Sequence, residues 1–230
     1  MYCAEPGLAS PSGSCSPGYF CGGGSSVASP HSSDPVHVSY TGETCVSTKN
    51  GTVNDICPPG HYCPAGSSSP LACPPGTNTS AVGLSSVDEC QRCSKGYYCP
   101  LSATVLATRQ CPSGYFCPSG TSNPTSNGTL LCPKGSSCPV GSWSPLPCGP
   151  GEYQDVEGQD QCKQCPAGSV CSDSAGTITP QVCRAGTSCA PGSSVESPCR
   201  LGSYQDVAES GSCKVCPAGH YCDVSAGKKI

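Results

Sequence analysis

The sequence predicts small disulfide-rich modules in tandem, made of loops and short two-stranded β ribbons with almost no helix, that together form an elongated rod. The first basis is composition, because 24 Cys, 29 Gly and 25 Pro occupy about a third of the 230 residues. Large apolar residues are scarce, with two Phe, one Trp and one Met, so a large hydrophobic core is excluded. Cysteine at about one residue in ten is typical of secreted chains in which cross-links replace such a core.

A seven-residue motif, CxxGxxC, is the second basis. It occurs eight times, at 15–21, 57–63, 93–99, 111–117, 132–138, 165–171, 183–189 and 216–222. A ninth segment, SYTGETC, has Ser39 in place of the first cysteine. Pro and Gly inside the motif favour a tight turn, because Pro fixes one backbone dihedral and Gly supplies the positive φ that other residues avoid. Short runs such as YQDV predict two-stranded ribbons, and no stretch keeps a helical period over three turns.

A longer repeat organises these motifs. All six cysteines from Cys132 to Cys171 recur 51 residues later, beginning at Cys183, and YQDV recurs with them, which indicates tandem duplication. A looser copy begins at Cys57 and carries an insertion before Cys132. The predicted divisions are a divergent N-terminal repeat at 1–56, a repeat with an insertion at 57–131, a repeat at 132–182 and a truncated repeat at 183–230.

The sequence begins in one part of the repeat and ends in another, so that the two ends would complete each other. One hypothesis is head-to-tail assembly, in which Cys216 and Cys222 of one chain contact the Cys15 and Cys21 region of the next, a heterologous contact that propagates. The other is that the sequence is a window of a longer repeat protein, with ordinary intrachain partners outside it.

The charge and the cysteines together indicate the compartment. Eleven Lys and Arg stand against 15 Asp and Glu, a net charge of −4, so nothing in the composition suits a nucleic-acid backbone. No run of about 18 apolar residues predicts a membrane span, and the N-terminal segment lacks the apolar stretch of a signal peptide. The expected localisation is extracellular or at the cell surface, after secretion, with the signal removed or upstream.

Metal binding is the competing interpretation of the cysteines. CQRC, CKQC and CKVC have the spacing that places two thiolates on one zinc ion, but they are embedded in a series of CxxGxxC motifs, unlike the separated pairs of zinc ribbons. A redox role needs a thioredoxin-like βαβ context, which the pattern lacks. The sequence therefore predicts neither a metal nor another cofactor.

Catalysis is not expected either. His61 and His220 occupy the same position of two motifs and are interpreted as structural, and no nucleophile elbow or phosphate loop appears. The acidic cluster of Asp155, Glu157 and Asp160 lacks the spacing of a calcium loop and predicts a solvated turn.

Glycosylation has a direct signature in three sequons. Asn50, Asn78 and Asn127 each begin an NxS or NxT triplet in a Gly-, Ser- or Thr-rich loop, so we expect exposed side chains and a sugar on at least one. Ser and Thr beside Pro also suit O-linked sugars.

A family resemblance follows from two segments, CGPGEYQDVEGQDQCKQC and CRLGSYQDVAESGSCKVC. They resemble the glycine- and cysteine-rich extracellular repeats that include ephrin-receptor-like modules and, more distantly, the cysteine-rich domains of tumour-necrosis-factor receptors. The resemblance covers most of residues 57–222. It implies modules stacked lengthwise, as in receptors, adhesins and protist surface proteins.

The resemblance also implies a disulfide pairing. Three long loops close on themselves, as Cys73 to Cys90, Cys148 to Cys162 and Cys199 to Cys213. Neighbouring motifs interlace, as Cys93 to Cys111, Cys99 to Cys117, Cys165 to Cys183 and Cys171 to Cys189. The partners of Cys3, Cys15, Cys45, Cys57, Cys63, Cys132 and Cys138 stay open, since six cysteines alone allow 15 arrangements.

Two functions compete on this basis. The favoured one is an extracellular structural glycoprotein, a disulfide-stapled rod that binds copies of itself head to tail in a surface fibre or coat of protist or algal type. The alternative is the ligand-binding ectodomain of a receptor or adhesin. Low charge and few aromatic residues favour the fibre, because binding faces concentrate Tyr, Trp and Arg.

Overall fold

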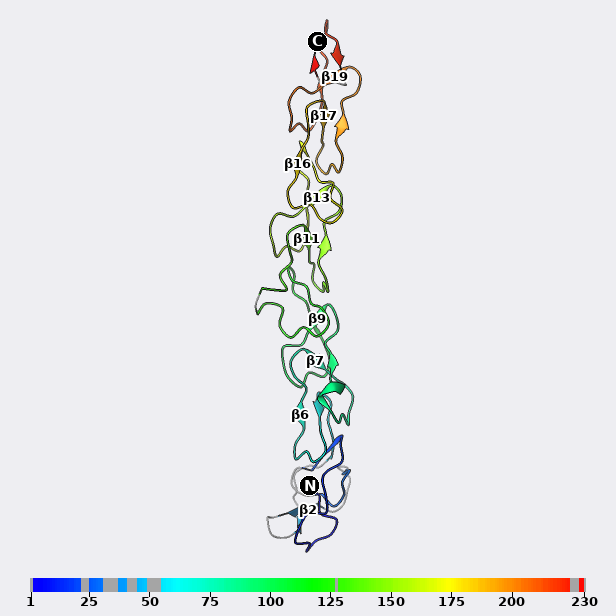
Figure 1. The fold of residues 1–230 in the computed structure, drawn as a ribbon, viewed down its shortest axis with the longest axis vertical. Helices are drawn as coiled ribbons and strands as arrows, with labels where there is room; N and C mark the ends of the chain where they lie inside the picture. The colour runs from blue at the N-terminus through cyan, green and yellow to red at the C-terminus, as the bar shows by residue number, and fades with distance from the viewer. Residues whose placement is uncertain are drawn as a thin grey trace. The chain divides into compact units, whose positions relative to one another are not determined.

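The structure, a computed structural model, consists of short strands joined by turns (Figure 1). It describes residues 2–21, 25–30, 37–40, 45–48, 55–126, 128–223 and 228–229, with side chains left out at 37–40, 45–48, 223 and 228–229. A 3₁₀ turn at Val87–Glu89 is the one helical element among these residues. The predicted fold class of tandem disulfide-rich modules with almost no helix is confirmed.

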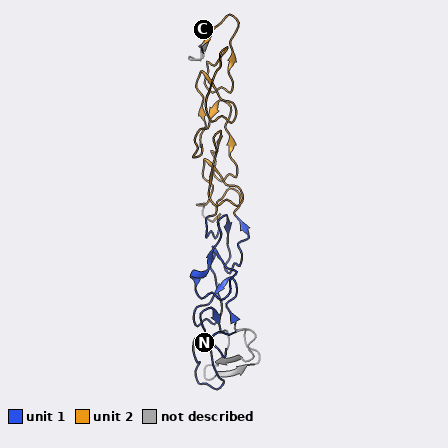
Figure 2. Cartoon of the chain, turned by 90° about the vertical axis from the view of Figure 1, so that its right-hand side faces the viewer, with its two compact units in different colours: residues 1–110, 118–123 blue, residues 111–117, 124–230 orange. Residues whose placement is uncertain are grey.

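The chain divides into two compact units (Figure 2). Unit 1 comprises residues 1–110 and 118–123, and unit 2 comprises residues 111–117 and 124–230. The division into four repeats stays a prediction, because these units follow contacts and not the repeat in the sequence.

Unit 1 contains two-stranded antiparallel ribbons. Its pairs are β1 Tyr19–Phe20 with β4 Asp55–Ile56, β2 His37–Tyr40 with β3 Cys45–Thr48, β5 His61–Tyr62 with β6 Leu71–Ala72, β7 Thr77–Asn78 with β8 Gln91–Arg92, and β9 Tyr97–Tyr98 with β10 Arg109–Gln110. Each of these strands is far too short to bury a face of its own, so the ribbons need the cross-links beside them.

Unit 2 repeats the same construction. Its pairs are β11 Ser136–Ser137 with β12 Leu146–Pro147, β13 Glu152–Tyr153 with β14 Lys163–Gln164, β15 Ser169–Val170 with β16 Gln181–Val182, β17 Thr187–Ser188 with β18 Ser197–Pro198, β19 Ser203–Tyr204 with β20 Lys214–Val215, and β21 Cys222–Asp223 with β22 Lys228–Lys229. A residue opposite its partner shares a face with it, which fixes which side chains of a ribbon meet.

The CxxGxxC motif folds as the tight turn that the sequence predicts. In the motif at 132–138 the N–H of Ser136 donates to the carbonyl of Pro133 at 3.3 Å, and Gly135 between them has a φ of 79°. A side chain at this position would be strained, so the motif requires glycine there.

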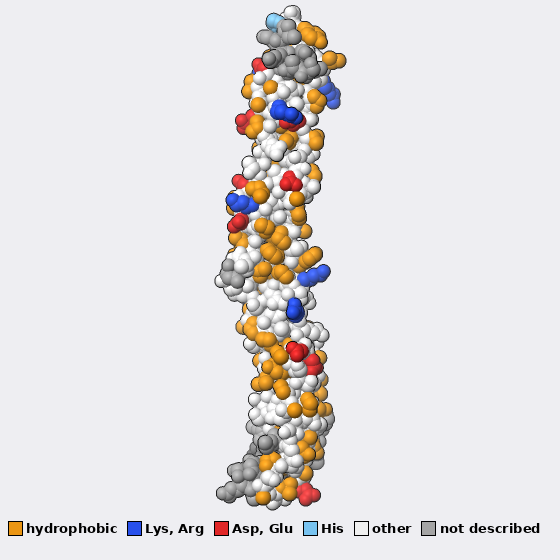
Figure 3. Space-filling model, viewed as in Figure 1, with side chains coloured by type: hydrophobic (Ala, Val, Ile, Leu, Met, Phe, Trp, Pro, Cys, Tyr) orange, Lys and Arg blue, Asp and Glu red, His pale blue; other side chains and the backbone are white. Residues whose placement is uncertain are grey.

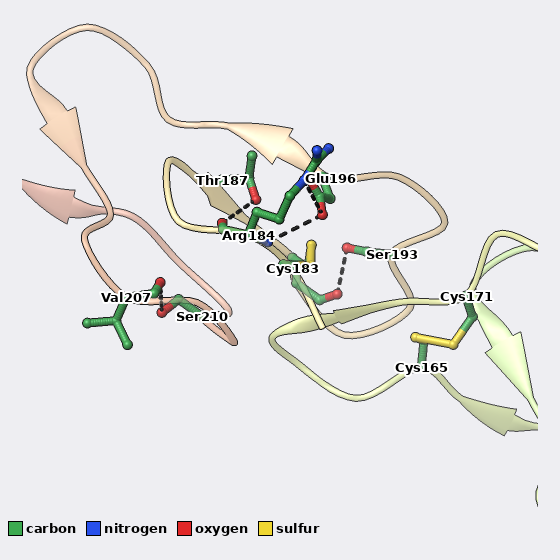
Figure 4. Close-up of a disulfide and its surroundings, with 11 residues drawn as sticks. Cys165, Cys171, Cys183, Arg184, Thr187, Ser193, Glu196, Val207 and Ser210 are labelled. Atoms are coloured by element: carbon green, nitrogen blue, oxygen red, sulfur yellow. Dashed lines mark hydrogen bonds and ion pairs between the residues drawn. A yellow bond between two sulfur atoms is a disulfide. The ribbon is translucent and has the colours of Figure 1, made fainter. Parts of the chain in front are cut away.

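Each motif is closed by its own disulfide, which corrects the interlaced pairing. The structure joins Cys93 to Cys99, Cys111 to Cys117, Cys165 to Cys171 and Cys183 to Cys189, in place of Cys93 to Cys111, Cys99 to Cys117, Cys165 to Cys183 and Cys171 to Cys189. The tight turn explains the difference, because it folds the chain back until the two Cα atoms of one motif lie 5.8–6.4 Å apart, within reach of a disulfide. Figure 4 shows this arrangement at Cys165 and Cys171.

The long loops close as the resemblance implies. Cys73 is joined to Cys90, Cys148 to Cys162 and Cys199 to Cys213, with Cα–Cα distances of 5.7–5.8 Å. Among the cysteines whose partners were open, Cys57 is joined to Cys63 and Cys132 to Cys138. The side chain of Cys45 lies outside the described residues.

Three further turns belong to the same series although they lack the closing cysteine. They are CPPGTNT, CGPGEYQ and CRLGSYQ, and their last residues are Thr79, Gln154 and Gln205. All three last side chains are buried, with Gln154 1% exposed. The Gln154 amide donates to the carbonyl of Gln161 at 2.8 Å and accepts from the N–H of Val156 at 3.2 Å, and Gln205 repeats both bonds with Ser212 and Val207. In these turns a hydrogen-bonded amide of Gln154 or Gln205, or the hydroxyl of Thr79, therefore replaces the closing sulfur.

A backbone ladder connects successive turns. The N–H of Gly135 donates to the carbonyl of Gln154 at 2.7 Å, the N–H of Cys148 donates back to the carbonyl of Gly135 at 2.9 Å, and the N–H of Gly158 donates to Cys132 at 2.8 Å. The turns approach so closely that a Cβ added to Gly135 would lie 2.7 Å from the carbonyl oxygen of Gly176. Close backbone contact takes the place of side-chain packing.

The core consists of sulfur. Nearly every described cysteine side chain is buried, and the other apolar side chains buried among the described residues include Leu84, Val170 and Pro124. Most remaining apolar side chains lie on the surface, where Figure 3 shows them in small groups on the face that it displays. This agrees with the absence of a large hydrophobic core that the composition predicts.

Candidate functional site

The cysteines predicted to join neighbouring chains are paired within the chain. The structure joins Cys15 to Cys21 and Cys216 to Cys222. A covalent head-to-tail link through these four residues is therefore wrong, for the same reason that the interlaced pairing is wrong: each tight turn already brings its own two cysteines together.

The CxxC segments hold no pair of thiolates for a metal. In CQRC, Cys90 is joined to Cys73 and Cys93 to Cys99, and CKQC and CKVC are divided between separate disulfides in the same way. No three His, Cys, Asp or Glu side chains gather in the described part of the chain where they could share an ion.

The acidic turn is occupied by a lysine. Asp155 Oδ1 accepts from Lys163 Nζ at 2.6 Å, and this hydrogen bond lowers the pKa of Asp155 and raises the pKa of Lys163. The ammonium also lies 5.7 Å from the centroid of the Tyr153 ring, a cation–π contact. The duplicate turn repeats both contacts with Asp206, Lys214 and Tyr204, which indicates a structural clamp on each ribbon.

A third ion pair connects the motif at 183–189 to the loop that follows it. Arg184 lies 3.0 Å from Glu196, and its hydrogen bond lowers the pKa of the Glu196 carboxyl (Figure 4). Because the two lysine pairs and the Arg184 guanidinium lie at the surface, these ion pairs contribute little to stability.

One predicted glycosylation site is described. Asn78 lies in β7 and is half-buried, not fully exposed as expected, and its amide nitrogen is 3.5 Å from the carbonyl of Val105. The third sequon residue, Ser80, is exposed. Asn50 and Asn127 lie outside the described residues.

Sequence reasoning missed a hollow in unit 1. It has a volume of about 250 Å³ and lies beside the loop from Cys99 to Thr108, and Tyr98 and Arg109 also line it. The feature of the sequence that could have indicated the hollow is the run TVLAT inside the inserted segment. The run alone does not show that its side chains are exposed, because their exposure depends on the contacts of the loop with the rest of the chain.

The chain was compared with known proteins. Residues 186–230 match the family described as tyrosine-protein kinase ephrin type A/B receptor-like. No curated protein matches the sequence. None of the described helices is long and apolar enough to cross a membrane.

The matched segment coincides with one stretch of the turn series. It contains the Gly186 turn, the loop closed by Cys199 and Cys213, and the motif closed by Cys216 and Cys222. Dense disulfides and a module of this family are consistent with an extracellular or secreted protein. Residues 186–230 are thus similar to a cysteine-rich ephrin-receptor-like module, and the described part of this segment contains disulfide-closed turns of the same kind as the preceding ones.

Proposed function

We propose that the chain is part of the ectodomain of a receptor or adhesin and presents a binding surface without catalysing a reaction. The observation that supports this function is that the groups that stabilise the fold are different from the side chains on its surface. Disulfides, glycines and the backbone ladder hold the turns together, so the side chains between the cysteines are released from core packing. Such a framework lets surface residues serve recognition at little cost in stability.

The described side chains give a catalytic role no support. No free cysteine occurs among the residues that the structure describes, so none of these sulfurs is a nucleophile. His61 Nδ1 lies 3.0 Å from the carbonyl of Pro59 within its own turn, which fits a structural role.

A surface fibre is the second candidate, and exposed apolar side chains in unit 2 favour it. Leu201 is 84% exposed and lies in the turn that begins at Cys199, and Val215 is 83% exposed and lies in β20, both within the segment that matches the family. Exposed side chains of this kind can be covered by a second copy without any covalent link.

The oligomeric state separates the two candidates. We would measure sedimentation velocity and record negative-stain images of the secreted, oxidised chain over a range of concentrations. A monodisperse monomer at every concentration supports the ectodomain. Filaments that disappear in the double variant Leu201→Ser and Val215→Ser support the fibre and contradict the ectodomain.

Glycosylation of Asn78 is the prediction that tests secretion. When the chain is expressed through a eukaryotic secretory pathway, we expect the Ser80→Ala variant to lose the mass of one N-linked glycan relative to the wild type, because the transferase requires the hydroxyl of the sequon. Intact-mass measurement checks it. Ser80→Ala is preferred to a change at Asn78, because it leaves the contact of Asn78 with Val105 in place.

The matched control is Ser80→Thr, which preserves the sequon and should keep the glycan. Equal masses of the wild type and Ser80→Ala, apart from the substitution itself, would count against a glycan at Asn78.

A further inference from the structure

We propose that the hollow lined by Tyr98, Arg109 and the loop from Cys99 to Thr108 binds an extracellular protein partner through an apolar side chain that stands next to a carboxylate. The proposal rests on the ectodomain function and names the site and the chemistry of its ligand.

The loop that forms the hollow is held at several points. The N–H of Ala103 donates to the carbonyl of Cys73 at 3.0 Å, the N–H of Thr79 donates to the carbonyl of Thr104 at 3.0 Å, and the Thr104 hydroxyl donates to the carbonyl of Leu101 at 2.7 Å. A loop fixed in this way presents its surface already formed, so binding needs little ordering of the backbone.

The backbone of the loop is also strained at Ala103, where it contacts the turn that contains Gly60. Ala103 has a φ of 56°, whereas the corresponding residue of most other turns is glycine. A Cβ on Gly60 would lie 2.5 Å from the carbonyl oxygen of Ala103, so the loop is pressed against the preceding turn. A residue held in this region indicates that the surroundings determine the conformation.

The rim of the hollow is apolar and open. Leu101 is 61% exposed and Leu106 is 62% exposed, and both line the hollow together with Pro100. Its volume of about 250 Å³ is below that of a typical small-molecule pocket, which favours a single apolar side chain over a drug-sized ligand.

Tyr98 and Arg109 form one wall. They are directly opposite in the β9–β10 ribbon, so their side chains share a face. Tyr is half-buried here and Arg is exposed, and both residue types are enriched among the residues that dominate protein interfaces.

The lining of the hollow carries one charged side chain, the guanidinium of Arg109, which favours a carboxylate as its partner. Between Glu89 and Glu152 the sequence has no acidic residue, although the whole chain carries a net charge of −4. Arg92, Lys95 and Arg109 lie in this stretch within unit 1, and none of the described ion pairs involves Arg109. A partner with Asp or Glu next to its apolar side chain would complement both the leucines and the guanidinium.

Selection from random dodecamer peptides displayed on phage tests the proposal. The oxidised full chain serves as bait. We expect the enriched peptides to share Leu, Ile or Phe next to Asp or Glu. In fluorescence anisotropy, Leu106→Ser and Arg109→Glu should each weaken binding about tenfold or more, because each removes one half of the recognised pair.

Val195→Ser is the matched control, since Val195 is an exposed valine in unit 2, and it should leave peptide binding unchanged. All variants alter exposed side chains, and mass spectrometry confirms that their disulfides are complete. Peptides that bind the wild type and Leu106→Ser equally, or that lack acidic residues, would overturn the proposal.

Heparin, a sulfated polysaccharide, is the second probe. If the wild type binds heparin, Arg109→Glu weakens this binding, Leu106→Ser does not, and no peptide is enriched, the surface binds anionic glycans and the proposal is wrong. If Leu106→Ser dissolves filaments of the chain, the occupant is a second copy, which also overturns it. If the chain is monomeric and enriches no peptide, the proposed binding at the hollow is wrong, whereas the proposed ectodomain function is not contradicted.

Discussion

Full reduction is expected to unfold the chain without any denaturant. Eleven disulfides occupy the described turns, and each closes a loop whose cysteines are 6 to 17 residues apart. At about 2–3 kcal/mol each, their sum exceeds the roughly 5–15 kcal/mol by which an ordinary protein is stable. Because the core consists of the sulfurs themselves, little apolar packing would hold the reduced chain together.

Limited proteolysis and amide hydrogen exchange measure the effect. The oxidised chain should resist protease and protect the ladder amides of Cys148 and Gly158, and the chain reduced in the presence of a chelator should lose both properties. The chelator alone, without reductant, is the control and should change neither. Protection that survives complete reduction would show that the fold does not depend on its disulfides.

The sequence was sufficient to predict the class of fold. The scarcity of large apolar residues, the turn motif and the repeat of six cysteines each depend on local chemistry, and the structure has the predicted turns and ribbons. The pairing within the motifs was not predictable in the same way. The cysteine spacing alone allows a cysteine to pair within its own motif or with a neighbouring motif. The Cα–Cα distance of 5.8–6.4 Å within a motif decides the partner only once the turn is folded.

Turns without a second cysteine were missed for a related reason. The motif was defined by its two sulfurs, whereas Thr79, Gln154 and Gln205 fill the same buried position with hydroxyl or amide groups. The pattern CxxGxx followed by a polar residue was visible in the sequence. Its burial depends on partners such as the carbonyl of Gln161, seven residues away, whose position the motif does not specify.

The hollow was missed because it depends on tertiary contacts. Leu101 and Leu106 are exposed since the backbone of Ala103 and Thr104 is bonded to Cys73 and Thr79, turns that lie far earlier in the sequence. Few aromatic residues led the sequence analysis to favour a fibre, but one Tyr and one Arg facing the same side are sufficient for a small binding surface.

The second large effect is expected from an alanine at Gly135. Gly135 and Gly141 follow one another in unit 2 with nearly the same backbone, φ 79° and 81°. An added Cβ at Gly135 would lie 2.7 Å from the carbonyl oxygen of Gly176, whereas at Gly141 it would meet nothing within 4 Å. Gly141→Ala should therefore cost only the strain of a positive φ, about 1–2 kcal/mol, and Gly135→Ala should cost about 3–5 kcal/mol because the turns must also separate.

Guanidinium denaturation of both oxidised variants measures this difference, and hydrogen exchange locates it. The amides of Gly135 and Cys148, whose hydrogen bonds join Gly135 to the turn from Cys148 to Gln154, should exchange faster in Gly135→Ala and remain protected in Gly141→Ala. The difference between the two variants isolates the contact between turns, since the backbone strain is common to both. Equal losses of stability would mean that close backbone stacking contributes nothing beyond the turn itself.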